Sequence, residues 1–214
     1  MNSPKYDLKI FIDDTSQVAL DEYIPVFHRW IQDQRLAELL IDVADYRHVP
    51  DGPGVVLIAH DAHYALDAAE GRLGLLYSRR RETRASRSTI GSVTERLQSV
   101  LACALTACEQ LEAEPALHGR LRFRGNELLL RSNDRLHTPD TAEAYAALHR
   151  HLAPCLALLY PGQRVEVERL HTRAERLTVA IKAAETPEVG TLLARLQGAA
   201  AGTGNAGGLA CQAH

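Results

Sequence analysis

The sequence predicts a single α+β domain. Short segments with the two-residue alternation of β-strands are interleaved with segments that have helical spacing of apolar residues. The 214 residues are 46% apolar and 24% charged, as in ordinary globular proteins. No Pro/Gly/Ser-rich linker divides residues 6–196. We therefore expect a mostly antiparallel mixed sheet of about nine short strands, with three or four amphipathic helices packed on it.

The first third of the chain is predicted to form strands around one helix. Residues 6–13 read as a strand because Leu8, Ile10 and Ile12 share one face. Apolar residues at three- and four-residue spacing over residues 20–31 then predict an amphipathic helix. Further strands are predicted, in order, at residues 39–43, 55–59, 64–66 and 73–77.

The rest of the chain suggests a repeated helix-hairpin unit. A capping box, Ser92 to Glu95, opens a helix whose apolar stripe runs to residue 111. Gly125-Asn126 is predicted to turn residues 121–124 back onto residues 128–130. A second helix after Thr138-Pro139 and a hairpin of residues 165–168 and 177–182 complete the second copy. The two units would occupy residues 92–133 and 140–182, followed by a short helix at 191–196.

Composition bounds the location and the partners of the chain. A formal net charge of −3 gives no global field that would attract nucleic acid or an anionic membrane. The apolar runs are too short to span a bilayer, and the first residues lack a signal-peptide pattern, so we expect a cytoplasmic protein. Four cysteines in a chain of this length are not a disulfide framework. We expect residues 1–197 to form the domain and the Ala/Gly-rich residues 198–214 to form a disordered tail.

Carboxylates follow two predicted strands and suggest a metal site. Asp13 ends the first strand, Asp42 and Asp45 end the second, and His48 follows in the next loop. If the two strands lie parallel in one sheet, their carboxyl ends share an edge. Such a cluster could hold a divalent cation and, through it, a phosphate. Aspartates are also favoured at strand ends simply because they cap turns.

A second candidate metal site is His60, Asp61 and His63. If Asp61-Ala62 is a two-residue turn, the two histidines become cross-strand neighbours. Two histidines and a carboxylate could fill three positions of a zinc or non-haem iron site. The alternative is a pair of solvated turn histidines. This turn and the acidic edge are expected at opposite edges of the sheet.

A basic loop before the capped helix is a candidate anion site. Guanidinium groups and hydroxyls beside a helix amino terminus can bind a phosphate. The alternative is a solvated loop, since no aromatic residue lies among its cations to stack on a nucleic-acid base. The candidate anion-binding residues are Arg79, Arg80, Arg81, Arg84 and Ser92.

These patterns leave three functional hypotheses. The motifs of dinucleotide, P-loop, hydrolase and zinc-protease sites are missing, which favours a non-catalytic accessory or binding protein that acts through a protein partner or a small anionic ligand. The first alternative is an enzyme of hydrolase or phosphoryl-transfer type that uses a divalent metal at one of the two candidate sites. The second is nucleic-acid binding through residues 79–87, which we regard as disfavoured. Exposed sheet edges also allow a homo-oligomer, whereas no membrane partner is expected.

Overall fold

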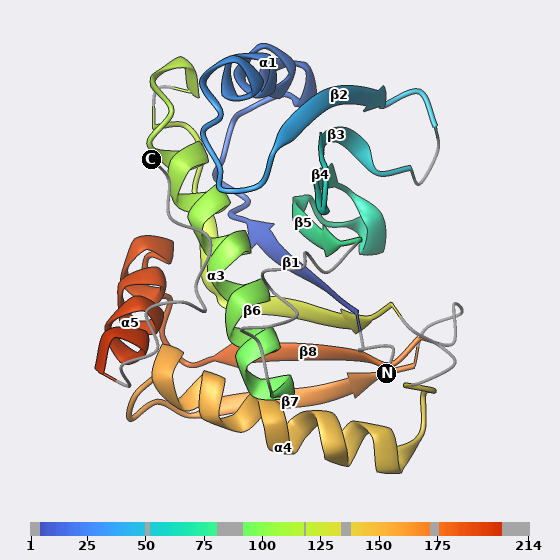
Figure 1. Cartoon of the computed structure of the whole chain (residues 1–214), viewed down its shortest axis with the longest axis vertical. Coiled ribbons are helices and arrows are strands. Elements are labelled where there is room, and N and C mark those ends of the chain that lie inside the picture. The colour runs from blue at the N-terminus through green and yellow to red at the C-terminus, as the bar shows by residue number, and fades with distance from the viewer. Residues whose placement is uncertain are drawn as a thin grey trace.

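The computed structural model confirms the α+β class. It describes residues 5–49, 52–80, 92–117, 119–133, 138–171 and 176–202. These residues form one eight-stranded sheet with the strand order β2-β3-β4-β5-β1-β6-β8-β7 (Figure 1). The strands are β1 (Tyr6–Ile12), β2 (Leu40–Tyr46), β3 (Gly54–Ala59), β4 (Ala62–Asp67), β5 (Gly74–Arg79), β6 (Phe123–Ser132), β7 (Val165–Leu170) and β8 (Thr178–Ala183). The described helices are α1 (Tyr23–Asp33), α3 (Val93–Glu112), α4 (Ala142–Leu159) and α5 (Val189–Gly202).

The sheet differs from the prediction in two respects. Every pair of neighbouring strands is antiparallel, so the sheet is not mixed. The described residues contain eight strands, where about nine were expected. The difference arises at β6, where one strand replaces a predicted hairpin.

Gly125 explains why β6 does not turn. A Cβ atom at this position would lie 2.0 Å from the backbone oxygen of Pro187. The carbonyl of Gly125 also accepts a hydrogen bond from Tyr160 Oη at 2.6 Å. The glycine therefore permits a close approach of two backbones within a continuous strand, rather than a turn. As a result, the helix-hairpin unit occurs once, as α4-β7-β8, and the predicted repeat is wrong.

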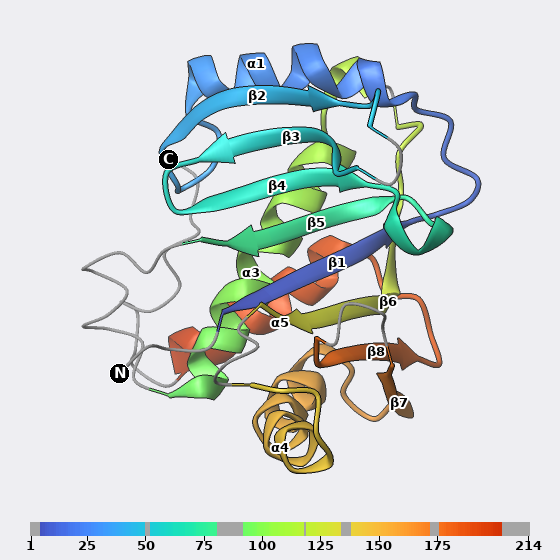
Figure 2. The ribbon, with the colours of Figure 1, turned by 90° about the vertical axis from the view of Figure 1, so that its right-hand side faces the viewer.

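The helices contribute the apolar cover of one side of the sheet. In Figure 2 the sheet lies in front of α3 and α5, while α1 lies beside β2. The predicted capping box of α3 is present, because Ser92 Oγ accepts from the Glu95 N–H (3.1 Å) and Glu95 Oε2 accepts from the Ser92 N–H (2.9 Å). The apolar stripe of α3 and the inward-facing strand residues form one buried cluster.

The last helix is longer than predicted. α5 begins at Val189 and ends at Gly202, so residues 198–202, which we expected in the tail, continue the helix. Residues 203–214 of the predicted tail lie outside the described residues.

No described α-helix lies in front of the side of the sheet that is turned toward the viewer in Figure 2, and we call this side the open face. At its centre, on β1, Lys9 is fully buried. Its Nζ donates to Asp67 Oδ2 at 3.0 Å and to the carbonyl of Ala69 at 2.7 Å, and it lies over the ring of Phe11. Strand register aligns Lys9 with a row of apolar neighbours across the sheet, namely Ala44, Val56, Ala65, Leu76, Leu129 and Ala180.

Side chains occupy several of the outer backbone groups at both edges of the sheet. On β2, the Leu40 N–H donates to Gln34 Oε1 (3.2 Å) and the Val43 N–H to Asp42 Oδ1 (2.8 Å). The Gln34 amide also donates to the carbonyl of Leu40, so it pairs with β2 as a strand would. On β7, the carbonyl of Val167 accepts from Tyr145 Oη at 3.0 Å. Occupied backbone groups and charged side chains at an edge oppose pairing with another chain.

The closed edge of β2 can be tested by removing its aspartate. Asp42→Val exposes the Val43 N–H and adds an apolar side chain to the edge, so self-association should strengthen by about tenfold. Light scattering over a concentration series measures the change in mean mass. Glu166→Val, on the other edge strand β7, is the matched control: it adds the same side chain without removing an acceptor from a backbone N–H, so it should strengthen self-association less than Asp42→Val. Equal behaviour of the two variants would contradict the role of Asp42.

The buried pair of Lys9 and Asp67 makes a second test. Lys9→Met leaves the Asp67 carboxylate buried without its ammonium partner and should lower the free energy of unfolding by about 3–5 kcal/mol. The double variant Lys9→Met/Asp67→Leu removes both charges of the pair and should recover most of that loss. Urea denaturation measures both. If the free energy of unfolding of Lys9→Met lies within about 1 kcal/mol of the wild-type value, the pair does not stabilise the fold as expected.

Candidate functional site

The two groups of carboxylates predicted to share a sheet edge lie far apart. β1 and β2 run in the same direction, but β5, β4 and β3 lie between them. Four strand spacings correspond to roughly 19 Å, which is too far for Asp13 and Asp42 to bind one metal ion. The predicted adjacency failed because strand order depends on contacts distant in sequence, which the local pattern does not contain.

Asp13 and Asp45 each accept hydrogen bonds from a residue two positions later. Asp13 Oδ1 accepts from the side chain and backbone of Thr15, and these hydrogen bonds lower the pKa of Asp13. Asp45 accepts from the side chain and backbone of Arg47, which lower its pKa to about 2, with a smaller contribution from His48. These contacts are those of aspartates that cap turns.

The histidine pair is displaced by one residue from the predicted geometry. The turn between β3 and β4 consists of His60 and Asp61, so His63 pairs with Ile58 across the hairpin. His60 Nδ1 lies 2.9 Å from Asp61 Oδ1. Burial lowers the pKa of His63, and the charge of Arg80 lowers it further. Among the residues that the structure describes, no three His, Cys, Asp or Glu side chains are grouped so that they could hold a metal ion.

The residues of the predicted anion site have other contacts. The Arg79 guanidinium is directed toward α3, where it donates to Ser99 Oγ at 3.0 Å. It also donates to Tyr77 Oη on its own strand at 3.1 Å. The Arg80 N–H donates to the carbonyl of Asp61, and Ser92 caps α3. Arg81 and Arg84 lie outside the described residues. Arg79 and Ser92 therefore serve the packing and start of α3 in this structure.

A polar cluster that the sequence did not reveal fixes the start of β2. Glu38, in the connection between α1 and β2, accepts from Tyr64 Oη (2.7 Å) and from Tyr77 Oη (3.1 Å). The two tyrosines are fully buried and their ring centroids lie 5.0 Å apart. The alternating pattern placed both tyrosines in strands, but no local signal links them to Glu38. This cluster holds the connection against the core.

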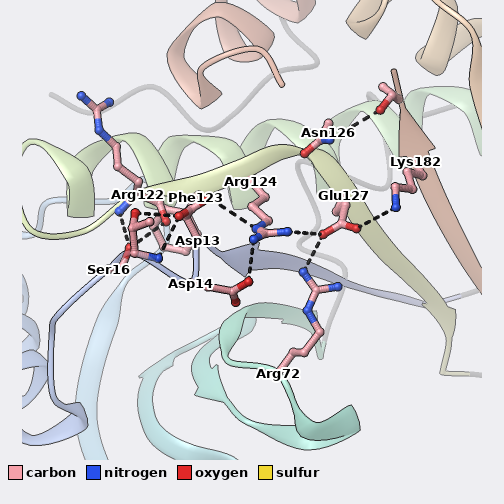
Figure 3. A network of polar contacts seen from close by, with 12 residues as sticks. Asp13, Asp14, Ser16, Arg72, Arg122, Phe123, Arg124, Asn126, Glu127 and Lys182 are labelled. Carbon is pink, nitrogen blue, oxygen red and sulfur yellow. Dashed lines mark hydrogen bonds and ion pairs between the residues drawn. The ribbon is translucent and has the colours of Figure 1, made fainter. Parts of the chain in front are cut away.

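The open face carries a network of charges around Glu127 (Figure 3). Glu127 Oε2 accepts from Arg72 at 2.5 Å, and Arg124 and Lys182 lie 3.4 and 3.6 Å from its carboxylate oxygens. Burial opposes ionisation of Glu127, but the hydrogen bond and charge of Arg72, with the other two cations, hold its pKa below the usual value. Arg72 also stacks on Phe11, 4.2 Å from the ring centroid.

The charges of this network balance, which decides what it can bind. Arg124 also contacts Asp14 at 2.6 Å and Asp13 at 3.4 Å. Arg72, Arg124 and Lys182 therefore face the carboxylates Glu127, Asp13 and Asp14, three positive charges against three negative. A ligand anion would have to displace one of these carboxylates. The network is better suited to joining the residues after β1 and before β5 to strands β6 and β8 than to binding a free anion.

One surface differs from the rest because it is apolar and exposed. All the large hydrophobic side chains that are exposed in the described residues lie between positions 39 and 49, in β2 and the residues beside it. Scattered apolar side chains are normal on a surface, but a group on one segment is typical of an interaction site. We call this group the β2 patch; its members, with their exposed fractions, are Leu39 (60%), Ile41 (52%), Tyr46 (42%) and Val49 (41%).

The titration of His63 gives a test of the hairpin geometry. Its lowered pKa means that the folded state prefers the neutral ring, so this contribution to stability is present above about pH 6.5 and decreases as the pH falls through that value. His63→Gln should therefore weaken the loss of melting temperature between about pH 7 and 5. His28→Gln, at an exposed position of α1, is the control. If the melting temperature of His63→Gln falls with pH as steeply as that of the wild type, the lowered pKa of His63 in the folded state is contradicted.

Comparisons with known proteins leave the geometry as the basis for function. No family model, curated protein or solved structure matches this chain. Within the described residues, no helix is long and apolar enough to cross a membrane. The β2 patch and the balanced network on the open face are thus the features from which a function must be argued.

Proposed function

We propose that this chain is a non-catalytic cytoplasmic binding protein that acts through a protein partner, and that the partner docks on the β2 patch. The observation that carries the proposal is the gathering of Leu39, Ile41, Tyr46 and Val49 on one exposed segment. Apolar and aromatic side chains form the centres of protein interfaces, and charged residues their rims.

The contacts behind the patch support its use as a rigid binding surface. Gln34 pairs with the backbone of Leu40, and Glu38 is held by Tyr64 and Tyr77. The residues that lead into β2 are therefore fixed before a partner arrives. A preorganised surface loses less conformational entropy on binding than a flexible one.

The other hypotheses receive less support from the geometry. A small anionic ligand would compete with Glu127 for Arg72, Arg124 and Lys182. A metal-dependent enzyme would need one of two sites: Asp13 and Asp42 follow or lie on strands separated by three others, and His63 pairs with Ile58 rather than with His60. Of residues 79–87, the candidate nucleic-acid loop, Arg79 is engaged with Ser99 on α3, and residues 81–87 lie outside the described residues.

A photocrosslinking amino acid at position 41 tests the proposed function. Incorporated into the full chain in cells, it should give an adduct of discrete mass, because Ile41 is an exposed member of the patch. The same amino acid at Glu166, an exposed position on β7, should give none. With the crosslinked protein purified, Ile41→Asp should weaken its binding by at least about tenfold, as expected for an interface centre. Identical adduct patterns at positions 41 and 166 would overturn the proposal.

A further inference from the structure

We infer that the β2 patch, if it has the proposed function, binds a basic amphipathic helix of the partner. The inference depends on three properties of the described residues around β2. They are the occupied backbone groups of the strand, the charge that surrounds the patch, and the length of its apolar surface.

The backbone of β2 is poorly suited to pairing with a partner strand. The N–H groups of Leu40 and Val43 already donate to the side chains of Gln34 and Asp42, and the N–H of Arg47, just after the strand, donates to Asp45. A partner strand would have to break these hydrogen bonds before it could form its own. A partner would therefore be recognised through the side chains of the patch. An amphipathic helix binds in this way, with its apolar face against an apolar surface.

The patch carries an excess of negative charge. Arg47 lies 2.8 Å from Asp45 and 4.0 Å from Asp21, so one guanidinium serves two carboxylates. No cation among the described residues lies within ion-pair distance of Asp42, whose Oδ1 accepts only the neighbouring Val43 N–H. Three carboxylates against one cation leave two negative charges beside the apolar side chains. A partner with Lys or Arg at the edges of its apolar stripe would match this charge.

The same charge argues against a second copy of the chain. In a symmetric dimer the identical surface of each subunit faces its partner. The surplus carboxylates of two β2 patches would then meet, which is unfavourable at close range.

The length of the patch fits a helix. Leu39 and Tyr46 are seven residues apart, a span of roughly 23 Å in an extended strand. A helix of about 15 residues has this length and makes roughly four turns. One apolar stripe of such a helix could contact both ends of the patch.

Synthetic peptides test the inference directly. The probes are a helix-forming peptide of about 15 residues with a leucine stripe and lysines elsewhere, and its analogue with glutamates in place of the lysines. Fluorescence anisotropy with the full chain should show at least about tenfold tighter binding of the lysine peptide, and this preference should weaken as salt is raised. Asp42→Lys should reduce binding of the lysine peptide by at least about fivefold and improve binding of the glutamate peptide. The control Glu166→Lys makes the same change of charge on β7 and should alter neither by more than about twofold.

Several outcomes would overturn the inference. Equal binding of the two peptides, or equal effects of Asp42→Lys and Glu166→Lys, would show that the patch does not select a basic helix. Tighter binding of an alternating valine/lysine peptide would show addition of a strand to β2. A crosslinked adduct at position 41 with twice the 23.6 kDa mass of the chain would identify a second copy as the occupant. A discrete adduct with another protein, without preference for the lysine peptide, would overturn this inference and leave the proposed function standing.

Discussion

The arrangement of the described helices beside one face of an eight-stranded sheet is the constraint from which the other features follow. The covered side can be filled by apolar residues alone, because α3 and its neighbours supply matching apolar surfaces. None of the described α-helices covers the open face, yet Lys9 and Asp67 on it are buried. Buried charges must be paired, and the contact of Lys9 with Asp67 meets that requirement. Farther along the same face, Glu127 draws Arg72, Arg124 and Lys182 together.

The edges of the sheet follow a similar logic and give the β2 patch its character. An open sheet has two edge strands whose outer backbone groups invite pairing with other chains. Here Gln34, Asp42 and Tyr145 occupy such groups. Protection of the backbone does not require polar side chains everywhere, and β2 keeps Ile41 and Tyr46 exposed. The strand therefore combines a closed backbone with an apolar surface, which suits recognition through side chains.

The sequence predicted local elements better than their assembly. The capping box of Ser92 and Glu95 gave the start of α3 because its signal lies within four residues. Gly125 was misread as a turn residue. A glycine is needed there because the backbone of Pro187, 62 positions later in the sequence, approaches closely. The candidate sites were affected in the same way. Their residue types were visible, but the separation of β1 from β2 and the exposure of Ile41 result from strand order and helix placement, which local periodicity does not encode.

The position of β1 has a consequence for how the chain folds. Strands β2 to β5 follow one another as a meander, and β7 and β8 are also consecutive, so both groups can form through contacts close in sequence. β1 joins them by pairing Asp7 with Ser78 on one side and Arg131 on the other. Closing loops of this length is slow compared with forming hairpins. Until β1 is in place, β5 and β6 are both unpaired edges, and the chain is most open to misassembly at the step that unites its two halves.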